Sequence, residues 1–187
     1  MLQIPAGFPP LFNMIRELRW EDMDDIIRNY YSYYNEMENE NPDLGLIFYW
    51  VKPDYPNEIG WFSNLYQAVI RGDAICLVAE EDGHVVGICD VHSKRPGSEV
   101  AHIGMLGIAI IKGYRGKGIG KALLQGMFKA CKGHFEILTL EVFSTNAKAY
   151  ELYRKAGFRE NGKLDKSIKR NGRYYSEIKM YIDLTES

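Results

Sequence analysis

The chain has 187 residues, of which 46% are hydrophobic and 13% aromatic, a size and composition that predict one domain, residues 1–187, with a sizeable core. Lys and Arg number 23 against 25 Asp and Glu, so a formal net charge of -2 argues against a nucleic-acid partner. No apolar run is long enough to span a membrane, and the proline-interrupted start lacks the basic segment of a signal peptide. Cys76, Cys89 and Cys131 lack CxxC spacing, which favours reduced, buried thiols and a cytoplasmic protein.

The first half of the chain predicts a strand, two helices and a hairpin. We expect the strand over residues 12–18 and a helix over 19–36, which opens with acidic residues. Prolines and clustered aromatics predict an irregular or only briefly helical segment over 39–57. Apolar residues at helical spacing predict a second helix over 58–71 that ends at Gly72. Asp82-Gly83 joins two β-rich runs, so residues 74–93 are expected to form an antiparallel hairpin.

The second half predicts a central strand followed by alternating helices and strands. Residues 100–111 are almost uninterruptedly apolar, as in a strand covered on both faces. We expect an amphipathic helix over 119–133, a strand over 135–143 and a helix over 144–158, capped by Thr145 or Asn146 and closed by Gly157. Residues 167–184 should form a terminal hairpin that turns at Asn171-Gly172.

The stretch "GYRGKGIGKALL", residues 113–124, places four glycines and three cations before a helix. The first N–H groups of a helix lack partners, and glycines let an anion approach them closely. The dinucleotide fingerprint fails because Lys121 replaces its final glycine, and the nucleotide P-loop would need glycine at Arg115 and a hydroxyl at Ala122. Taken alone, the glycines favour an anion site and a plain turn with solvated cations about equally.

The pattern Arg-x-x-Gly-x-Gly at Arg115, Gly118 and Gly120 separates an apolar strand from an amphipathic helix. With this pattern, "IGMLGIAIIKGYRGKGIGKALL" and "LEVFSTNAKAYELYRKAGF" resemble two motifs of the GNAT superfamily of acetyl-CoA-dependent N-acetyltransferases, in the family's order. The resemblance implies an α/β (α+β) fold with a mixed, mostly antiparallel sheet of six or seven strands and helices on both faces. It also implies that the strands near 102–111 and 135–143 diverge at a cofactor cleft.

The resemblance further implies which residues bind acetyl-CoA, with no metal. The loop amides would hold the pyrophosphate, backbone groups of the diverging strand would pair with the pantetheine arm, and a helix asparagine would contact that arm. The corresponding residues are Arg115, Gly116, Lys117, Gly118, Ile119 and Gly120 in the loop, Ile108, Ala109 and Ile110 on the strand, and Asn146 with Tyr153 on the helix.

Two of these positions would carry the chemistry of acetyl transfer. Tyr153 would present its hydroxyl to the thioester sulfur, although a core aromatic is the plainer interpretation. Glu141 precedes it by twelve residues, a spacing found in relatives similar to the ribosomal-protein alanine N-acetyltransferases, and could take the amine proton through water. A solvent-facing strand residue is an equally good interpretation of Glu141, and His102 is a weaker candidate base.

The resemblance implies a primary amine as the acceptor, and the candidates are a protein N-terminus, an amino acid or related small molecule, and a polyamine. Glu36, Glu38, Glu40 and Asp43 could attract a cationic amine, but a solvated surface run is the favoured interpretation. A non-catalytic acyl-CoA-binding regulatory module is the alternative function, less favoured because Tyr153 and Glu141 are both present. The sequence leaves the oligomeric state open, a homodimer included.

Overall fold

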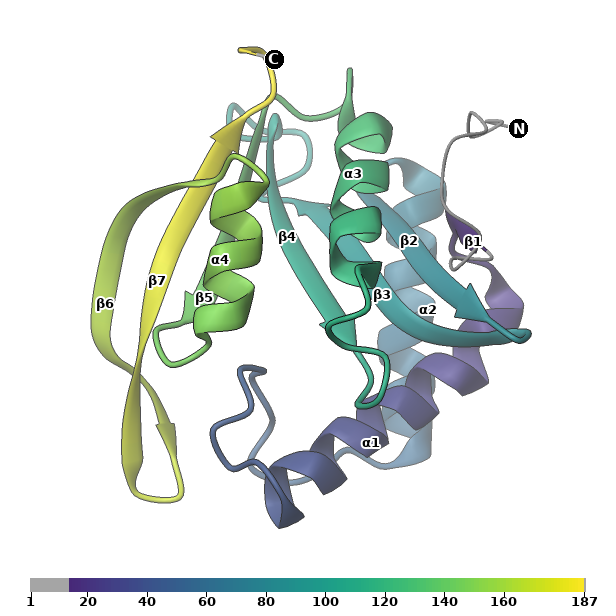
Figure 1. Ribbon diagram of the computed structural model, residues 1–187. Helices are drawn as coiled ribbons and strands as arrows, with labels where there is room; N and C mark the ends of the chain where they lie inside the picture. The colour runs from purple at the N-terminus through teal and green to yellow at the C-terminus, as the bar shows by residue number, and fades with distance from the viewer. Residues whose placement is uncertain (1–13, 187) are drawn as a thin grey trace.

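The computed structural model describes residues 14–186, which form one seven-stranded sheet with helices on both faces (Figure 1). The strands are β1 (Met14–Glu17), β2 (Ala74–Glu81), β3 (His84–Ser93), β4 (Ile103–Ile110), β5 (Ile137–Phe143), β6 (Arg159–Arg170) and β7 (Arg173–Asp183). The helices are a 3-10 turn (Trp20–Asp22), α1 (Met23–Asn39), α2 (Tyr55–Arg71), α3 (Ile119–Cys131) and α4 (Ala147–Lys155). The proline-rich start, with residues 12 and 13 of the first expected strand, lies outside the described residues.

The strands lie in the order β1-β2-β3-β4-β5-β7-β6, and every neighbouring pair is antiparallel except β4 and β5. The predicted mixed, mostly antiparallel sheet is therefore confirmed. Both hairpin turns have the left-handed backbone that two-residue turns favour: φ is 52° and 80° at Asp82-Gly83, and 49° and 77° at Asn171-Gly172.

The parallel pair β4 and β5 separates after three residues. Ile103 to Met105 pair with Ile137 to Thr139, whereas β4 continues to Ile110 and β5 to Phe143 without further pairing. This is the divergence that the family resemblance implied, and it leaves a gap in the middle of the sheet.

Helices α3 and α4 cover one face of the sheet, and α1 and α2 cover the other (Figure 1). On the α3/α4 face, Leu123 and Met127 pack with alternate residues of β3, β4 and β5 in the largest hydrophobic core. On the α1/α2 face, Ile26 and Phe62 pack against β2 and β3 in a second core. The lysines of α3 point to solvent, as its amphipathic pattern predicts.

The three cysteines are buried and unpaired with one another, as predicted. Burial raises the pKa of the Cys131 thiol to about 12, so this thiol is unreactive in the folded protein. Within residues 14–186, no helix combines the length and the apolar composition that crossing a membrane would take.

Strand β6 begins at Arg159, eight residues before the start of the expected hairpin. Its first part, "RENGKLDK", is polar and mostly exposed because β6 is an edge strand, so it carries no alternating pattern. The ladder with β7 shifts between Leu164 and Ile168, where Lys166 has φ 57°.

Helix α2 also begins earlier than expected, at Tyr55, where Asp54 caps it by accepting a hydrogen bond from the Asn57 N–H at 3.0 Å.

The segment between α1 and α2, residues 40–54, is irregular as predicted and is held in place by Arg170 of β6. The buried Arg170 guanidinium donates hydrogen bonds to the carbonyls of Pro42 and Leu44, both at 2.8 Å, and to that of Leu46. Three rings pack around the guanidinium: Phe48, Phe143 and Tyr175. One side chain thus fastens this segment to the β6–β7 hairpin.

Candidate active site

Backbone groups of β4 turn alternately to its two neighbours. The Ile111 N–H donates to the Val86 carbonyl on the β3 side at 3.1 Å, and the Gly104 carbonyl accepts from the Thr139 hydroxyl on the β5 side at 3.2 Å. Because the direction alternates along a strand, odd-numbered residues of β4 face β3 and even-numbered residues face β5.

Beyond the paired segment, the even-numbered residues therefore face the gap instead of a strand. The backbone N–H groups of Ile108 and Ile110 lie along the edge of the gap, whereas the N–H of Ala109 is directed to β3. Two of the three strand positions expected to meet a pantetheine arm thus offer backbone groups to it. The backbone groups of Ala109 pair with β3, so they are not free to bind the arm.

The glycine-rich loop continues from the open end of the gap. Gly113, Gly116 and Gly118 have φ of 89°, 78° and 89°, a conformation that costs other residues free energy, and Gly118 is the N-cap of α3. In the described part of the chain, the backbone N–H groups of residues 115–118 donate no hydrogen bond of ordinary geometry, and those of residues 119–121 belong to the first turn of α3, which lacks intrahelical acceptors. The loop therefore presents a run of free donors at a helix N-terminus, which suits an anion.

The Arg115 side chain attaches this loop to α1 and to the end of β4. Its guanidinium forms a bidentate ion pair with Glu36 of α1, at 2.5 and 2.8 Å, and its Nε donates to the Ile110 carbonyl at 2.6 Å. The Glu36 side chain is only 8% exposed. The Arg115 side chain is thus committed to the protein, and what this residue offers an anion is its backbone N–H.

The acidic run that sequence patterning favoured as a solvated surface is mostly paired. Besides Glu36, Glu40 pairs with Lys112, and Asp43 accepts from the Tyr175 hydroxyl at 2.7 Å. The interpretation as a solvated run is wrong for the buried Glu36. It holds for Glu40 and Asp43, whose side chains are 50% and 45% exposed although each has a partner distant in sequence. Glu38 remains exposed.

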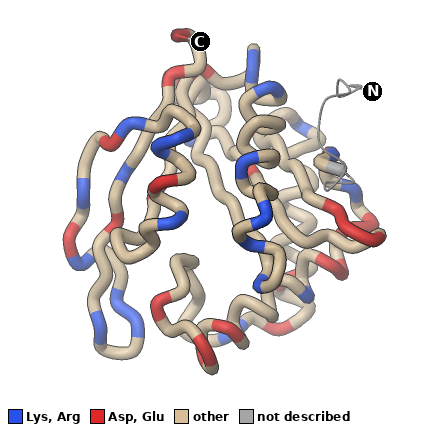
Figure 2. The backbone as a smooth tube through the Cα atoms, viewed as in Figure 1, with Lys and Arg blue, Asp and Glu red and all other residues tan. Residues whose placement is uncertain are grey.

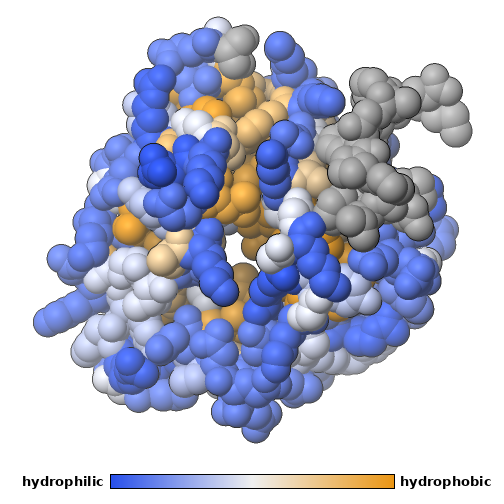
Figure 3. All heavy atoms as spheres, viewed as in Figure 1, coloured by the Kyte–Doolittle hydropathy of each residue, from blue (hydrophilic) through white to orange (hydrophobic). Residues whose placement is uncertain are grey.

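The opening between α3 and α4 is hollow, basic at its rim and apolar inside. Lys and Arg positions line both helices around it (Figure 2), and hydrophobic residues lie at its base (Figure 3). Lys117 and Lys121 are exposed at this rim. A ligand with an anionic end and an uncharged arm matches this distribution.

Asn146 caps α4, the role that its position favoured. Its Oδ1 accepts from the Ala149 N–H at 3.1 Å, while among the described residues no acceptor lies within hydrogen-bond distance of Nδ2. A side chain at Gly45 would lie 2.7 Å from that Nδ2, so the α1–α2 segment passes directly over the start of α4. The amide nitrogen of Asn146 thus lies beside the backbone of the α1–α2 segment.

Tyr153 is buried on α4 and packs edge-on against Phe158, with ring centroids 5.8 Å apart. Burial raises the pKa of Tyr153, and the nearby Cys89 thiol of β3 adds to that rise, so the hydroxyl is protonated at neutral pH. Cys89 is the strand partner of Ile108. Tyr153 belongs to the hydrophobic core against which Ile108 and Ile110 of β4 pack, so its ring lies on the α3/α4 face of the sheet.

Glu141 lies on β5 at the other side of the gap. Its neighbours Leu140 and Val142 point into the α3/α4 core, so Glu141 is on the α1/α2 face, opposite Tyr153. The carboxylate is 41% exposed and lies 3.1 Å from Lys179 of β7. Glu141 and Tyr153 thus flank the gap from the two faces of the sheet.

His102 lies before the start of β4, at the end where β4 and β5 are still paired. Eight strand residues, or about 26 Å, separate it from Ile110. The structure does not bring His102 to the gap.

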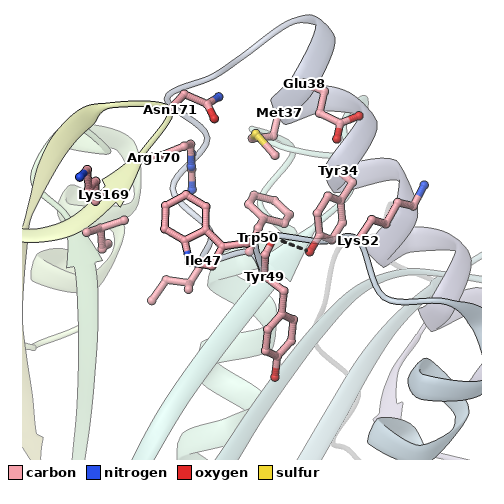
Figure 4. Close-up of a pocket in the computed structure, with 12 residues that line it drawn as sticks. Tyr34, Met37, Glu38, Ile47, Tyr49, Trp50, Lys52, Lys169, Arg170 and Asn171 are labelled. Atoms are coloured by element: carbon pink, nitrogen blue, oxygen red, sulfur yellow. Dashed lines mark hydrogen bonds between the residues drawn. The ribbon is translucent and has the colours of Figure 1, made fainter.

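A separate pocket of about 170 Å³ lies between the end of α1, the α1–α2 segment and the tip of the β6–β7 hairpin (Figure 4). The Tyr34 hydroxyl donates to the Tyr49 carbonyl at 3.2 Å inside it. Trp50 is 82% exposed and Ile47 64% exposed at its edge. This pocket lies at the end of α1, and both aromatic and charged side chains line it.

Comparisons with known proteins agree with this geometry. Residues 20–158 match the Acetyltransferase (GNAT) family model. The L-amino acid N-acetyltransferase AaaT of Escherichia coli (strain K12) is 34% identical over 101 residues, which are 52% of this chain but only 61% of that protein.

Two solved structures have the same fold. The ribosomal-protein-alanine N-acetyltransferase of Brucella melitensis superposes with a TM-score of 0.76 at 26% identity, covering 91% of this chain and 99% of that one. A phosphinothricin acetyltransferase from Sinorhizobium meliloti, in complex with acetyl-CoA, gives 0.75 at 20% identity, covering 91% and 87%. The family match spans most of the chain and includes the diverging strands, the glycine-rich loop and all of α4, so this protein belongs to the GNAT acetyltransferase family.

Proposed function

We propose that this protein transfers the acetyl group of acetyl-CoA to a primary amine. One observation carries the proposal: β4 leaves β5 after three residues, and the strand edge thus freed leads directly into a loop of unpaired amides at the start of α3. Phosphate groups fit the loop, and an amide-containing arm fits the strand edge.

The chemistry of the residues present suits acetyl-CoA. The N–H groups of residues 115–121 would bind its pyrophosphate, and backbone groups of Ile108 and Ile110 would pair with its pantetheine arm, which Asn146 would also contact. Bound acetyl-CoA supplies an acetyl group activated as a thioester. The Arg115 side chain already holds the Ile110 carbonyl, so what Ile110 offers is its N–H. One of the N–H groups along this edge, near Ile110, would bind the thioester oxygen as charge develops on it.

Tyr153 and Glu141 would handle the protons of the reaction. Tyr153 is protonated at neutral pH and lies beside the gap, so it can donate to the sulfur as the carbon–sulfur bond breaks. Glu141 faces the opposite side, where an acceptor would approach, and can take a proton from the amine through a water molecule. The new carbon–nitrogen bond then forms between these two residues.

The acceptor would reach the gap from the α1/α2 face. The aromatic α1–α2 segment and the β6–β7 hairpin border that approach and are fastened together by Arg170. A protein N-terminus and a free amino acid, the substrates named for related proteins, are both candidate acceptors, as is a polyamine.

A thiol-release assay tests the proposal. Acetyl-CoA is incubated with the protein and with amino acids, polyamines or short peptides of different first residues. We expect acetylated product from at least one class, identified by mass spectrometry. Tight acetyl-CoA binding without any product would favour the non-catalytic acyl-CoA-binding module instead.

A further inference from the structure

Asp90 of β3 is a carboxylate that the resemblance to the family does not assign. Its neighbours Cys89 and Val91 point into the α3/α4 core, so Asp90 is on the α1/α2 face, as Glu141 is. Its strand partner on β4 is Gly107. A β-carbon at Gly107 would lie 3.2 Å from Asp90 Oδ1 and 3.6 Å from Oδ2, so the carboxylate occupies the space that a side chain at residue 107 would fill.

The His92 side chain on the same strand pairs with this carboxylate. Its Nε2 lies 3.1 Å from Asp90 Oδ2, and the two side chains are 43% and 25% exposed. The neighbouring Met105 of β4 is 51% exposed on the same face. The Asp90 carboxylate is therefore oriented by its neighbour and remains open to solvent.

The carboxylate lies at the edge of the gap. Gly107 directly precedes Ile108, whose N–H faces the gap, and it follows Met105, the last residue of β4 to pair with β5. On β5, Glu141 stands in the corresponding position, two residues beyond the last paired residue. Asp90 and Glu141 thus lie on the same face of the sheet on either side of the gap, and Glu141 pairs with Lys179 of β7 whereas Asp90 pairs with His92.

Building on the proposed acetyl transfer, we propose that Asp90 binds the ammonium group of the acceptor and holds it at the β4 edge of the gap, on the same face of the sheet as Glu141. A charged amine loses hydration at the site, and a fixed carboxylate compensates for that loss through a charge-assisted hydrogen bond. The negative charge of Asp90 also favours a cationic acceptor over a neutral one. Asp90 is thus a binding residue, His92 positions it, and Glu141 keeps the role of base.

Steady-state kinetics of Asp90→Asn test this assignment with the best amine found in the thiol-release assay. Asparagine keeps the size and removes the charge, so the KM for the amine should rise roughly tenfold, the loss of one charge-assisted hydrogen bond, while kcat and acetyl-CoA affinity stay near the parental values. Gly107→Ala should act in the same direction, because its methyl group would displace the carboxylate. Asp165→Asn, on the far edge strand β6, is the matched control and should change neither constant.

Salt dependence separates binding from a merely structural role. Added salt should raise the parental KM for the cationic amine, and this dependence should weaken in Asp90→Asn. A folded Asp90→Asn variant with parental KM, or with unchanged salt dependence, overturns the assignment while leaving acetyl transfer intact. A parent that acetylates no amine overturns the proposed function and this inference together.

Discussion

Replacing Gly118 by alanine is expected to weaken acetyl-CoA binding far more than it weakens the fold. Gly118 has φ 89° at the N-cap of α3, and a β-carbon in that region costs about 1 to 2 kcal/mol. For a chain of this size, that cost corresponds to a decrease in Tm of about 2 to 8 °C. If the strained loop turns even one N–H away from the phosphate, affinity should fall roughly tenfold to a hundredfold, because a hydrogen bond to a charged group contributes about 1.5 to 3 kcal/mol.

Gly133→Ala is the matched control for this prediction. Gly133 has φ 85°, nothing lies within 4 Å of its β-carbon position, and it follows the opposite end of α3. Both variants should lose similar stability in thermal unfolding, but only Gly118→Ala should lose acetyl-CoA affinity in calorimetry. Equal affinities in the two variants would refute the assignment of the loop as the pyrophosphate site.

Four further predictions follow from the same geometry. Tyr153→Phe should keep acetyl-CoA affinity and lower kcat by about 10²-fold, because only the proton donor is removed; a parental kcat would exclude that role. Glu141→Gln should be most defective at low pH, where little acceptor amine is neutral, and raising the pH should partly restore turnover; a defect independent of pH would contradict the base assignment. The pKa of His92, measured by NMR, should exceed 6.5 because of its hydrogen bond to Asp90, and Asp90→Asn should lower it. The His92–Asp90 pair stabilises the fold below pH 6.5 and loses its contribution as the pH rises through the folded-state pKa of His92. The difference in unfolding free energy between the parent and Asp90→Asn should therefore be smaller at alkaline pH. Arg170→Met should release the α1–α2 segment, seen as faster proteolysis within residues 40–54 with little change in the core, since three carbonyls lose their donor.

Local signals in the sequence were sufficient to predict most of the helices, strands and turns. Asp82-Gly83 and Asn171-Gly172 impose left-handed turns that only a few residues tolerate, and the spacing of Leu123 and Met127 determines which face of α3 is buried. The divergence of β4 from β5 has no such local signal, since Ile108 and its neighbours look like any buried strand. It was predicted from the resemblance of two motifs to a known family.

Contacts between distant residues could not be predicted. Glu36 and Arg115 are 79 positions apart, so their ion pair depends on how α1 crosses the end of β4. The position of Asp90 over Gly107 depends on the β3–β4 register, which one residue of slippage would invert. The one sequence signal at Asp90 is a carboxylate within the otherwise apolar run "VVGICDV", a placement that costs free energy unless a partner or ligand compensates for it.

Hydrogen exchange with and without acetyl-CoA tests the central claim most directly. The amides of residues 115–118 donate no hydrogen bond of ordinary geometry among the described residues, and those of residues 119–121 lie in the first turn of α3. Those of Ile108 and Ile110 face the gap, so all of these amides should exchange fast in the free protein and become protected when acetyl-CoA binds. Amides of β2, which pair with β1 and β3, should show no comparable change. Saturating acetyl-CoA that leaves residues 108–121 exchanging as in the free protein would contradict the account.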